Sequence, residues 1–250
     1  AGAKSCFDLT RKKAAAAVCL ERRAYAKNPK GSRPDGLFFE GSGQFFFQDP
    51  PPTLSLNPKS WWEKIRFISS TYYSTREIFK KIGVAEPELS KKELNSRAFI
   101  SKTAIPMYQT FSKAHYTGNV KDIRTVVSRK FLEEIESSDQ FKKLQKARKS
   151  TAFKKQHKKL AWEGKDFKAS IDMAAVAQLG DQDQFSFEVG QFYIKFQSSQ
   201  RVYIDQEGDD TKIVDSEKVK KPFKTVRETL VFERCVNRAQ PWKILGKFEN

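Results

Sequence analysis

The sequence predicts an α+β protein in which N-terminal helices pack on a curved antiparallel sheet, preceded by an extended tail. Three observations predict this class. Prolines and glycines are dense in residues 26–58, apolar residues recur at helical spacing over 59–136, and they alternate with period two after Leu160. Helices followed by strands are typical of α+β proteins. We expect a basic, Pro- and Phe-rich tail at 1–58 and an α+β domain at 59–250.

The N-terminal stretch is rich in alanine and in basic residues, and poor in acids. That composition is typical of a mitochondrial targeting helix, and Arg23 shortly before Tyr25 is similar to a matrix-protease cleavage site. The alternative, which we favour, is a retained basic arm that follows a presequence already removed. We expect this arm to bind RNA through its cations, which are Arg11, Lys12, Lys13, Arg22 and Arg23.

Residues 26–58 form the second part of the tail. Their prolines fix φ and remove amide donors, so no regular element is expected to run through them. The segment also holds aromatic residues, in which disordered linkers are poor: Phe38, Phe39, Phe45, Phe46 and Phe47. We predict that the segment runs extended across a neighbouring molecule, protein or RNA. The alternative, which the sequence leaves equally open, is that the phenylalanines pack on the chain's own domain.

A first helix is expected from residue 59. Ser60 is a candidate N-cap with Glu63 three residues later, which fits a capping box, and Gly83 is a natural stop. Apolar residues at helical spacing predict that one face of this helix lies in the core. These residues are Ile65, Ile68, Tyr72 and Phe79.

Two further helices are expected, over about 89–116 and 120–136. Pro106 should break or restart the first of them, and Gly118 should end it. His115 is expected at the edge of the core or on the surface. The predicted core stripes of these helices are Ala104, Tyr108 and Phe111, followed by Ile123, Val126, Val127, Phe131 and Ile135.

Residues 141–159 are the most basic run, with nine Lys or Arg and no acid. Unbalanced like charge repels itself unless a polyanion lies near, whereas a solvated helix face normally interleaves acids. An anionic membrane would also attract the run, but its apolar line is too thin to insert deeply. We therefore expect contacts to RNA phosphate from Lys142, Lys143, Lys146, Arg148, Lys149, Lys154, Lys155, Lys158 and Lys159.

The pattern after Leu160 indicates strands. Apolar residues alternate over 185–189 and again over 192–196 in a shifted phase, so Gly190 between them predicts a β-bulge. The last two strands are expected at 229–236 and 242–248, joined by a short loop. The acids between Asp205 and Asp210 lack the spacing of a calcium loop and indicate a turn. Together these spacings predict an antiparallel meander.

The charge points to polyanionic partners. The chain of 250 residues has 47 basic and 30 acidic residues, a formal charge of +17. Nucleic acid and anionic membranes are the candidates, and a merely basic enzyme is the alternative. Cys6, Cys19 and Cys235 are too scattered for a disulfide framework or a zinc site, and no apolar run approaches a membrane span. Without a nucleophile or phosphate-loop motif, we expect no catalysis, cofactor, metal or small-molecule substrate.

The C-terminal hairpin carries a resemblance to a known family. Residues 231–234 and 241–247 resemble its closing hairpin, while 108–118 and 122–132 resemble its helix, glycine turn and next helix. That mitochondrial family includes the tether subunit of the inner-membrane presequence translocase, the large-subunit ribosomal protein near the tunnel exit, and the related fungal membrane-bound ribosome receptor. The resemblance covers 59–250. It implies a cone-shaped helix-and-sheet domain that is a binding module and not an enzyme.

Among these family members, the charge and the basic run favour the ribosomal ones. We expect a structural component of the mitochondrial large ribosomal subunit near the polypeptide tunnel exit, located in the matrix and associated with the inner membrane. Its expected partners are ribosomal RNA, neighbouring ribosomal proteins, and the inner membrane or its insertion machinery through a peripheral contact. The alternative is a protein-import motor tether that binds a chaperone and cardiolipin. A third hypothesis is a small-ligand enzyme on the same cone, which would need a polar cluster in its pocket.

Overall fold

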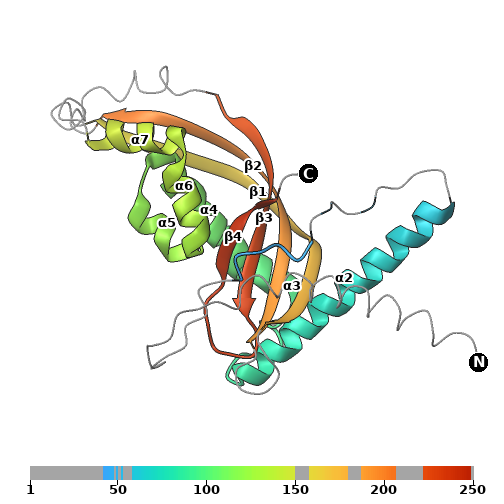
Figure 1. The fold of residues 1–250 in the computed structure, drawn as a ribbon. Coiled ribbons are helices and arrows are strands. Elements are labelled where there is room, and N and C mark those ends of the chain that lie inside the picture. The colour runs from blue at the N-terminus through green and yellow to red at the C-terminus, as the bar shows by residue number, and fades with distance from the viewer. Residues whose placement is uncertain are drawn as a thin grey trace, which may run out of the picture. The chain divides into compact units, whose positions relative to one another are not determined.

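The computed structural model describes residues 42–47, 49, 52, 58–149, 158–179, 187–206 and 222–248. All of them belong to one compact unit, Phe39–Asn250. The α+β class is confirmed, because helices precede an antiparallel sheet and pack on it (Figure 1). The helices are α2 (Pro58–Ala85), α3 (Ser96–Phe99), the π-helical turn η2 (Ile100–Ala104), α4 (Ile105–Thr117), α5 (Val120–Val126), α6 (Arg129–Ser137) and α7 (Asp139–Lys149). The strands are β1 (Lys158–Leu179), β2 (Phe187–Gln206), β3 (Lys224–Cys235) and β4 (Lys243–Phe248).

The strands form an antiparallel meander in the order β1-β2-β3-β4, as predicted. β3 starts earlier than the expected 229–236, and Trp242 precedes β4 instead of opening it. The pairing of β1 with β2 shifts register twice, between Lys165 and Lys168 and between Ile171 and Met173. Each irregularity inserts one extra residue into β1 and so switches the alternation of its side chains between the two faces. Ile171 therefore packs against the main core, whereas Met173 belongs to the second core on the other face.

Gly190 does not lie at a bulge, and that prediction was wrong: it pairs in register with both neighbouring strands. A Cβ at Gly190 would lie 2.8 Å from Val236 Cγ1 and 2.9 Å from Ile78 Cγ1, so a close approach of α2 requires glycine. The shifted apolar phase has a different cause. Phe192 belongs to the core on the helix side of β2, whereas Tyr193 belongs to a second core on the other side.

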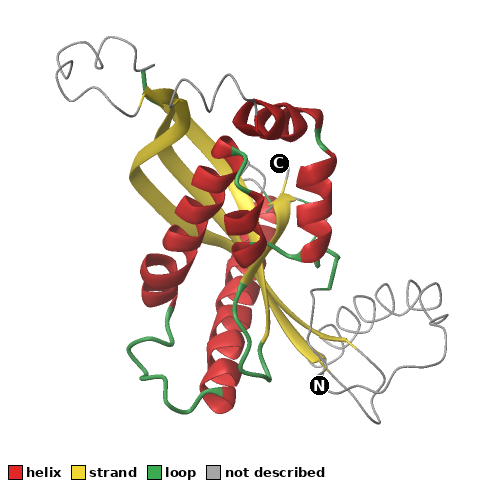
Figure 2. Ribbon diagram, turned by 90° about the vertical axis from the view of Figure 1, so that its left-hand side faces the viewer, coloured by secondary structure: helices red, strands yellow, loops and turns green. Residues whose placement is uncertain are grey.

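The main core lies between the helices and one face of the sheet (Figure 2). Phe99 and Phe192 both pack against Trp242, with ring centroids 4.7 and 5.2 Å apart, respectively. Farther along β2, the ring of Tyr108 stacks on Phe196 at 4.2 Å. The predicted stripes of the second and third helices are confirmed as buried, namely Ala104, Tyr108, Phe111, Ile123, Val126, Val127, Phe131 and Ile135.

The first helix differs from its prediction at both ends. α2 begins at Pro58, so Ser60 lies inside its first turn instead of capping it. Proline suits a first helical position because that amide has no partner within the helix. The helix also continues through Gly83 to Ala85. A Cβ at Gly83 would lie 2.7 Å from Leu94 Cδ1, so this glycine serves close packing rather than helix termination.

The second and third predicted helices are each divided. Pro106 falls in the first turn of α4, directly after the π-helical turn η2, which agrees with a restart at proline. Gly118 ends α4 with a φ of 67°, as expected. The third helix breaks between α5 and α6, where the Ser128 amide donates to Ile244 O on β4 at 2.9 Å. The hydrogen bond to β4 therefore replaces a bond within the helix, and the predicted single helix is interrupted at this point.

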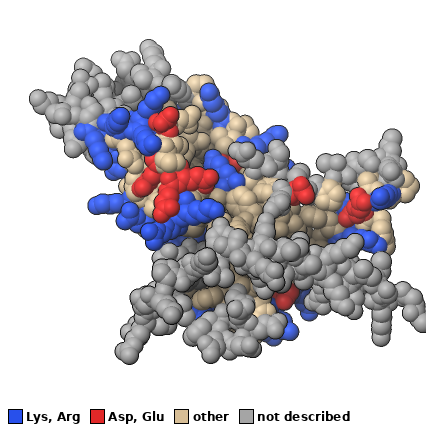
Figure 3. Space-filling model, viewed as in Figure 1, with Lys and Arg blue, Asp and Glu red and all other residues tan. Residues whose placement is uncertain are grey.

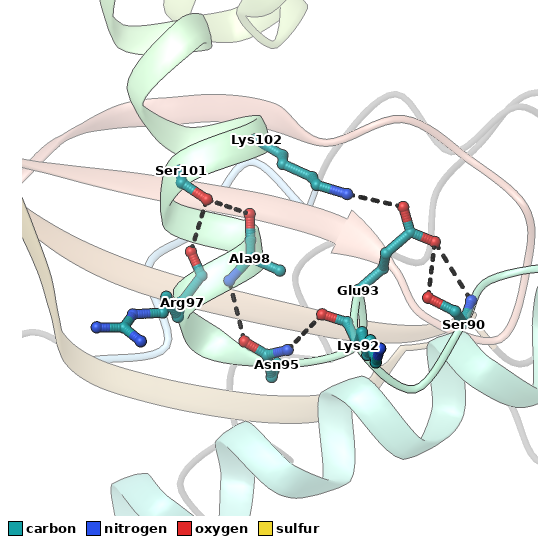
Figure 4. A network of polar contacts seen from close by, with 8 residues as sticks. All are labelled: Ser90, Lys92, Glu93, Asn95, Arg97, Ala98, Ser101 and Lys102. Atoms are coloured by element: carbon teal, nitrogen blue, oxygen red, sulfur yellow. Dashed lines mark hydrogen bonds and ion pairs between the residues drawn. The ribbon is translucent and has the colours of Figure 1, made fainter.

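The connection between α2 and α3 is held by local polar contacts (Figure 4). Glu93 accepts hydrogen bonds from Ser90 and pairs with Lys102 at 2.9 Å. The Lys102 hydrogen bond and then the Ser90 contacts lower the pKa of the Glu93 carboxyl. Asn95 caps α3, since its Oδ1 accepts from the Ala98 amide at 3.0 Å. These contacts fix where α3 begins, and so the position of Phe99 in the core.

Residues Ser42–Phe47, termed the strap, cover part of the other face of the sheet. The Phe47 ring lies 5.4 Å from Tyr193 and 6.2 Å from Phe67 of α2. The Phe45 ring lies 6.0 Å from Phe248. Of the two alternatives for the tail, packing on the chain's own domain is therefore observed for Phe45 and Phe47. The boundary at residue 58 stays a prediction, although the compact unit begins at Phe39.

Candidate nucleic-acid interface

Helix α7 presents the basic run to solvent. Its first turn is capped by Ser138, whose Oγ accepts from the Phe141 amide at 3.3 Å. Phe141 is buried and stacks on His115 of α4 at 5.8 Å. Anchoring α7 through Phe141 turns the opposite side of the helix outward. The exposed cations there are Lys142, Lys143, Lys146, Arg148 and Lys149.

The lysines of α7 have no ion-pair partner among the residues that the structure describes. Lys146 is the helical neighbour of Lys142, Lys143 and Lys149, at spacings of three or four residues. Each such like-charge pair costs a helix about 0.2–0.5 kcal/mol. Arg148 differs from these lysines because its Nη1 donates to Gly118 O at 3.2 Å. Part of its function is therefore to hold α7 against the end of α4.

An acidic band borders this basic surface. Glu133 and Glu134 of α6 are exposed, and Glu133 pairs with Arg129 at 3.2 Å. In Figure 3, acidic side chains separate the basic group at the α7 end from a second basic group below it. The positive charge on this side of the molecule is therefore divided into separate groups, and α7 carries one of them.

The structure places only part of the predicted set of RNA contacts. Lys158 and Lys159 open β1, so the basic run continues from a helix into a strand. The following predicted contacts lie outside the described residues: Lys154, Lys155, Arg11, Lys12, Lys13, Arg22 and Arg23.

Helix α2 carries an apolar surface that we expected to lie in the core. The prediction was wrong for Ile65, Ile68 and Tyr72, which are 50–62% exposed, whereas Phe79 is buried. Trp61, Trp62 and Tyr73 are also more than half exposed. Figure 1 shows the C-terminal end of α2 beside the sheet and its N-terminal half leading away from it. Apolar spacing predicts an amphipathic helix but does not tell which part of its length the core covers.

A buried polar network lies between α4 and the sheet. Tyr108 Oη donates to Glu228 Oε1 at 2.7 Å and accepts from Gln200 Nε2 at 2.8 Å. Gln200 Oε1 in turn accepts from Trp162 Nε1 at 3.0 Å. Burial, followed by the Glu228 charge, raises the pKa of Tyr108 and keeps the phenol neutral. These groups satisfy one another, as a structural network does.

Two further polar side chains, His115 and Ser112 of α4, lie in the same region. Burial, followed by the Lys247 charge, lowers the pKa of His115, so its imidazole is neutral. Ser112 Oγ is buried, and its interaction with Tyr108 acts against the rise in the pKa of that phenol. Within the described ranges, no group of His, Cys, Asp and Glu side chains is arranged to hold a metal ion. In the same ranges, no helix has the length and apolarity to cross a membrane.

No protein-family model matches the chain, and no curated protein matches it. The family resemblance of 59–250 therefore stays a prediction. The α7 cations and the apolar surface of α2 are the two exposed surfaces that stand out by their chemistry.

Proposed function

We propose that this protein is a structural, RNA-binding component of the mitochondrial large ribosomal subunit near the polypeptide tunnel exit, and that it helps attach the ribosome to the inner membrane. The observation that carries the proposal is the exposed cationic side of α7. Its lysines lack ion-pair partners within the described part of the chain. Phosphate groups would supply the missing opposite charge without reading sequence.

The membrane half of the proposal is supported by α2. Tryptophan and tyrosine prefer the membrane–water interface, and lysine and arginine attract anionic headgroups. α2 combines Trp62 and Tyr72 with Lys64 and Arg66, and Arg66 lies 5.3 Å from the Trp62 ring. An amphipathic helix of this kind lies in the interface rather than across the bilayer. Ribosomal RNA would therefore contact α7 while the membrane or its insertion machinery contacts α2.

The second candidate function is a protein-import motor tether that binds a chaperone and cardiolipin. The apolar surface of α2 favours it as much as it favours ribosome attachment, because both need a peripheral membrane contact. The charge on α7, whose lysines have no ion-pair partner among the described residues, favours the ribosomal function, since lipid attraction by α2 would leave that charge without a partner. RNA binding by α7 together with membrane contact by α2 would therefore account for both exposed surfaces.

The test uses the full chain and purified mitochondrial large ribosomal subunits. In one variant, Lys142, Lys143 and Lys146 are replaced by glutamine, which leaves the contact of Arg148 with Gly118 in place. Each lost phosphate contact lowers the log–log salt slope of binding by roughly 0.7–0.9, so we expect a decrease of about 2 to 3. The matched control replaces Lys80, Lys91 and Lys92, three exposed lysines outside α7.

Co-sedimentation with the subunits and flotation with cardiolipin vesicles are measured separately. Loss of ribosome binding with vesicle binding intact supports the proposal. Loss of vesicle binding with ribosome attachment intact reverses the assignment of α7 in favour of the tether. Equal effects of the α7 variant and the control variant mean that general charge, not α7, drives attachment, which rejects the proposal.

A further inference from the structure

The sheet face that turns away from the helices has two different halves. One half carries Tyr193, Val231 and Phe248, which form the second core with the strap residue Phe47. The other half lies toward the far ends of β1 and β2, where Lys168, Lys195 and Arg227 are exposed. In Figure 2 helices lie on only one side of that upper part of the sheet.

Strand register brings three cations together on this half. Lys168 of β1 and Arg227 of β3 both pair with Gln197 of β2, so they lie on either side of it. Lys195 lies two residues from Gln197 on the same strand and face. Neighbouring strands are about 4.8 Å apart, and diagonal neighbours on one face are about 7–8 Å apart. The three charges therefore form a triangle, termed the sheet triad.

The sheet triad lacks counter-charge. Lys168, Lys195 and Arg227 form no ion pair with any described residue. Glu163, which pairs with Arg201 across the strands, also forms an ion pair with that arginine at 2.6 Å. Asp166 and Asp172 occupy the two irregularities of β1, and neither is ion-paired with a described residue. Positive charge is thus in excess on this half, as it is on α7.

The cations continue beyond the triad. Lys165 Nζ and the Arg201 guanidinium both lie 4.4 Å from the centroid of the Phe223 ring. This arrangement holds two more positive groups at the same face, at the end away from the strap. Between these groups the exposed positions are polar, such as Ser170, Gln197 and Thr225. Among the described residues of this face, the apolar groups beside these cations are the partly exposed rings of Phe223 and Tyr203, against which Lys165 and Arg201 lie. The surface therefore has the charge for a polyanion but little apolar area to enter a lipid bilayer or to form the core of a protein interface.

We propose that the sheet triad, extended by Lys165 and Arg201, binds the phosphate backbone of a second RNA segment. The inference rests on the proposed RNA-binding function and deepens it. α7 packs on the helix side of the molecule through Phe141, whereas the sheet triad faces the other side. One domain then joins two RNA segments that lie on opposite sides of the sheet. This is a bridging function, which one basic surface does not provide.

The test compares three matched variants of the full chain. The sheet variant replaces Lys168, Lys195 and Arg227 by glutamine. The α7 variant and the control variant are those defined above, and each removes the same number of charges. The probe is a short RNA hairpin of mixed sequence, and both binding affinity and stoichiometry are measured over a range of salt concentrations. Thermal unfolding checks that each variant folds, which exposed polar substitutions should allow.

The wild-type chain is expected to bind two hairpins at saturation, and the sheet variant one. The log–log salt slope of RNA binding should be smaller for the sheet variant than for the wild-type chain by about 2 to 3. A sheet variant that retains two hairpins, or that behaves as the control variant does, overturns the inference. So does a sheet variant that loses binding to cardiolipin vesicles but not to RNA, since the surface would then be a membrane contact.

The α7 variant separates this inference from the proposed function. If the α7 variant loses one hairpin and the sheet variant loses none, the proposed function stands and the sheet inference fails. If the sheet variant alone loses a hairpin, the sheet site stands and the assignment to α7 fails. If neither variant loses a hairpin, both are rejected.

Discussion

Glu233 shows how one buried carboxylate fixes the path of the strap. It is 3% exposed, and it accepts from the Ser42 amide at 2.6 Å, from the Ser42 hydroxyl, and from Gln191 Nε2 at 2.6 Å. Phe46 and Phe47 extend the contact by donating their amides to Gln191 Oε1 and Tyr193 Oη. Burial raises the pKa of Tyr193 to about 12, so its phenol stays a neutral donor and acceptor.

Replacing Glu233 by alanine should release the strap. The donors of Ser42 and Gln191 would be left without their acceptor, which costs about 1–3 kcal/mol of the free energy of unfolding. Chymotrypsin should then cleave after Phe45 or Phe47 faster than in the wild-type chain. Glu134→Ala, at an exposed position of α6, is the control. Unchanged cleavage rates in both variants would mean that the aromatic contacts alone hold the strap.

His115 provides a pH dependence whose sign follows from its burial. Burial and the charge of Lys247 lower its pKa below the ordinary value of 6.5, while Glu228 opposes this. As the pH falls below 6.5, the unfolded chain takes up a proton more readily than the folded one, so stability is lost. Above 6.5 this contribution is fully present.

Chemical denaturation of the wild-type chain and of His115→Gln between about pH 8 and pH 5 tests this. The free energy of unfolding of the wild type should fall relative to that of the variant as the pH drops below 6.5. Parallel curves over that interval would show that the imidazole is protonated equally in both states.

At the scale of elements, α2 stands out because it exposes large apolar side chains instead of packing them in the core. Only Ile78, Phe79 and Ile82, near its C-terminal end, are buried. The earlier turns expose tryptophan, isoleucine and tyrosine to an extent that a monomer rarely tolerates in one contiguous patch. These turns therefore contribute little to folding and are available to a partner.

The triple variant Trp62→Ala, Ile68→Ala and Tyr72→Ala should separate folding from membrane contact. Its free energy of unfolding should stay within about 0.5 kcal/mol of the wild type, because the side chains are exposed and alanine favours helix. Binding to vesicles that contain cardiolipin should fall at least about tenfold, since each large side chain contributes about 1.5–3 kcal/mol when fully buried. Ser69→Ala with Ser70→Ala, on the same helix, is the control.

Two outcomes would contradict this assignment of α2. Unfolding of the triple variant would show that the turns are part of a core. Unchanged vesicle binding with a folded chain would show that the aromatic surface serves a protein partner instead.

At the scale of the whole molecule, the two unpaired basic surfaces face away from each other. α7 lies on the helix side, and Lys168, Lys195 and Arg227 lie on the uncovered half of the sheet. Distant sites without shared partners contribute additively to a free energy. The two surfaces should therefore act independently on the salt dependence of RNA binding.

Combining the α7 and sheet substitutions in one chain tests this independence. With six charges removed, the log–log salt slope for binding to the mitochondrial large subunit should decrease by about 4 to 5, the sum of the separate decreases. A combined decrease equal to that of one variant alone would show that the two surfaces compete for a single RNA segment.

The sequence predicted the order of helices and strands because hydrophobic period depends on local spacing. The buried positions of Tyr108, Phe111 and Phe131 followed from it. Local spacing does not tell which partner covers a stripe, so the exposure of Ile65 and Ile68 on α2 was missed. The α7 cations could be recognised because they lie close together in the sequence, whereas those of the sheet triad do not.

The sheet triad was hidden because its members are far apart in the chain. Lys168, Lys195 and Arg227 come from three strands, and only their register brings them together. That register depends on the two irregularities of β1, of which the first has Gly164 beside it and the second has no neighbouring glycine or proline. The formal charge of +17 did indicate a further basic surface, because the nine cations of residues 141–159 account for only part of it.

The contacts of the strap also form in an order that is set by translation of the chain. Ser42 is translated 191 residues before its acceptor Glu233. Phe47 packs on Tyr193 of β2 and Phe67 of α2, but Phe45 packs on Phe248 of β4, which is made later still. The strap can therefore complete its contacts only after the last strand of the described sheet has been synthesised.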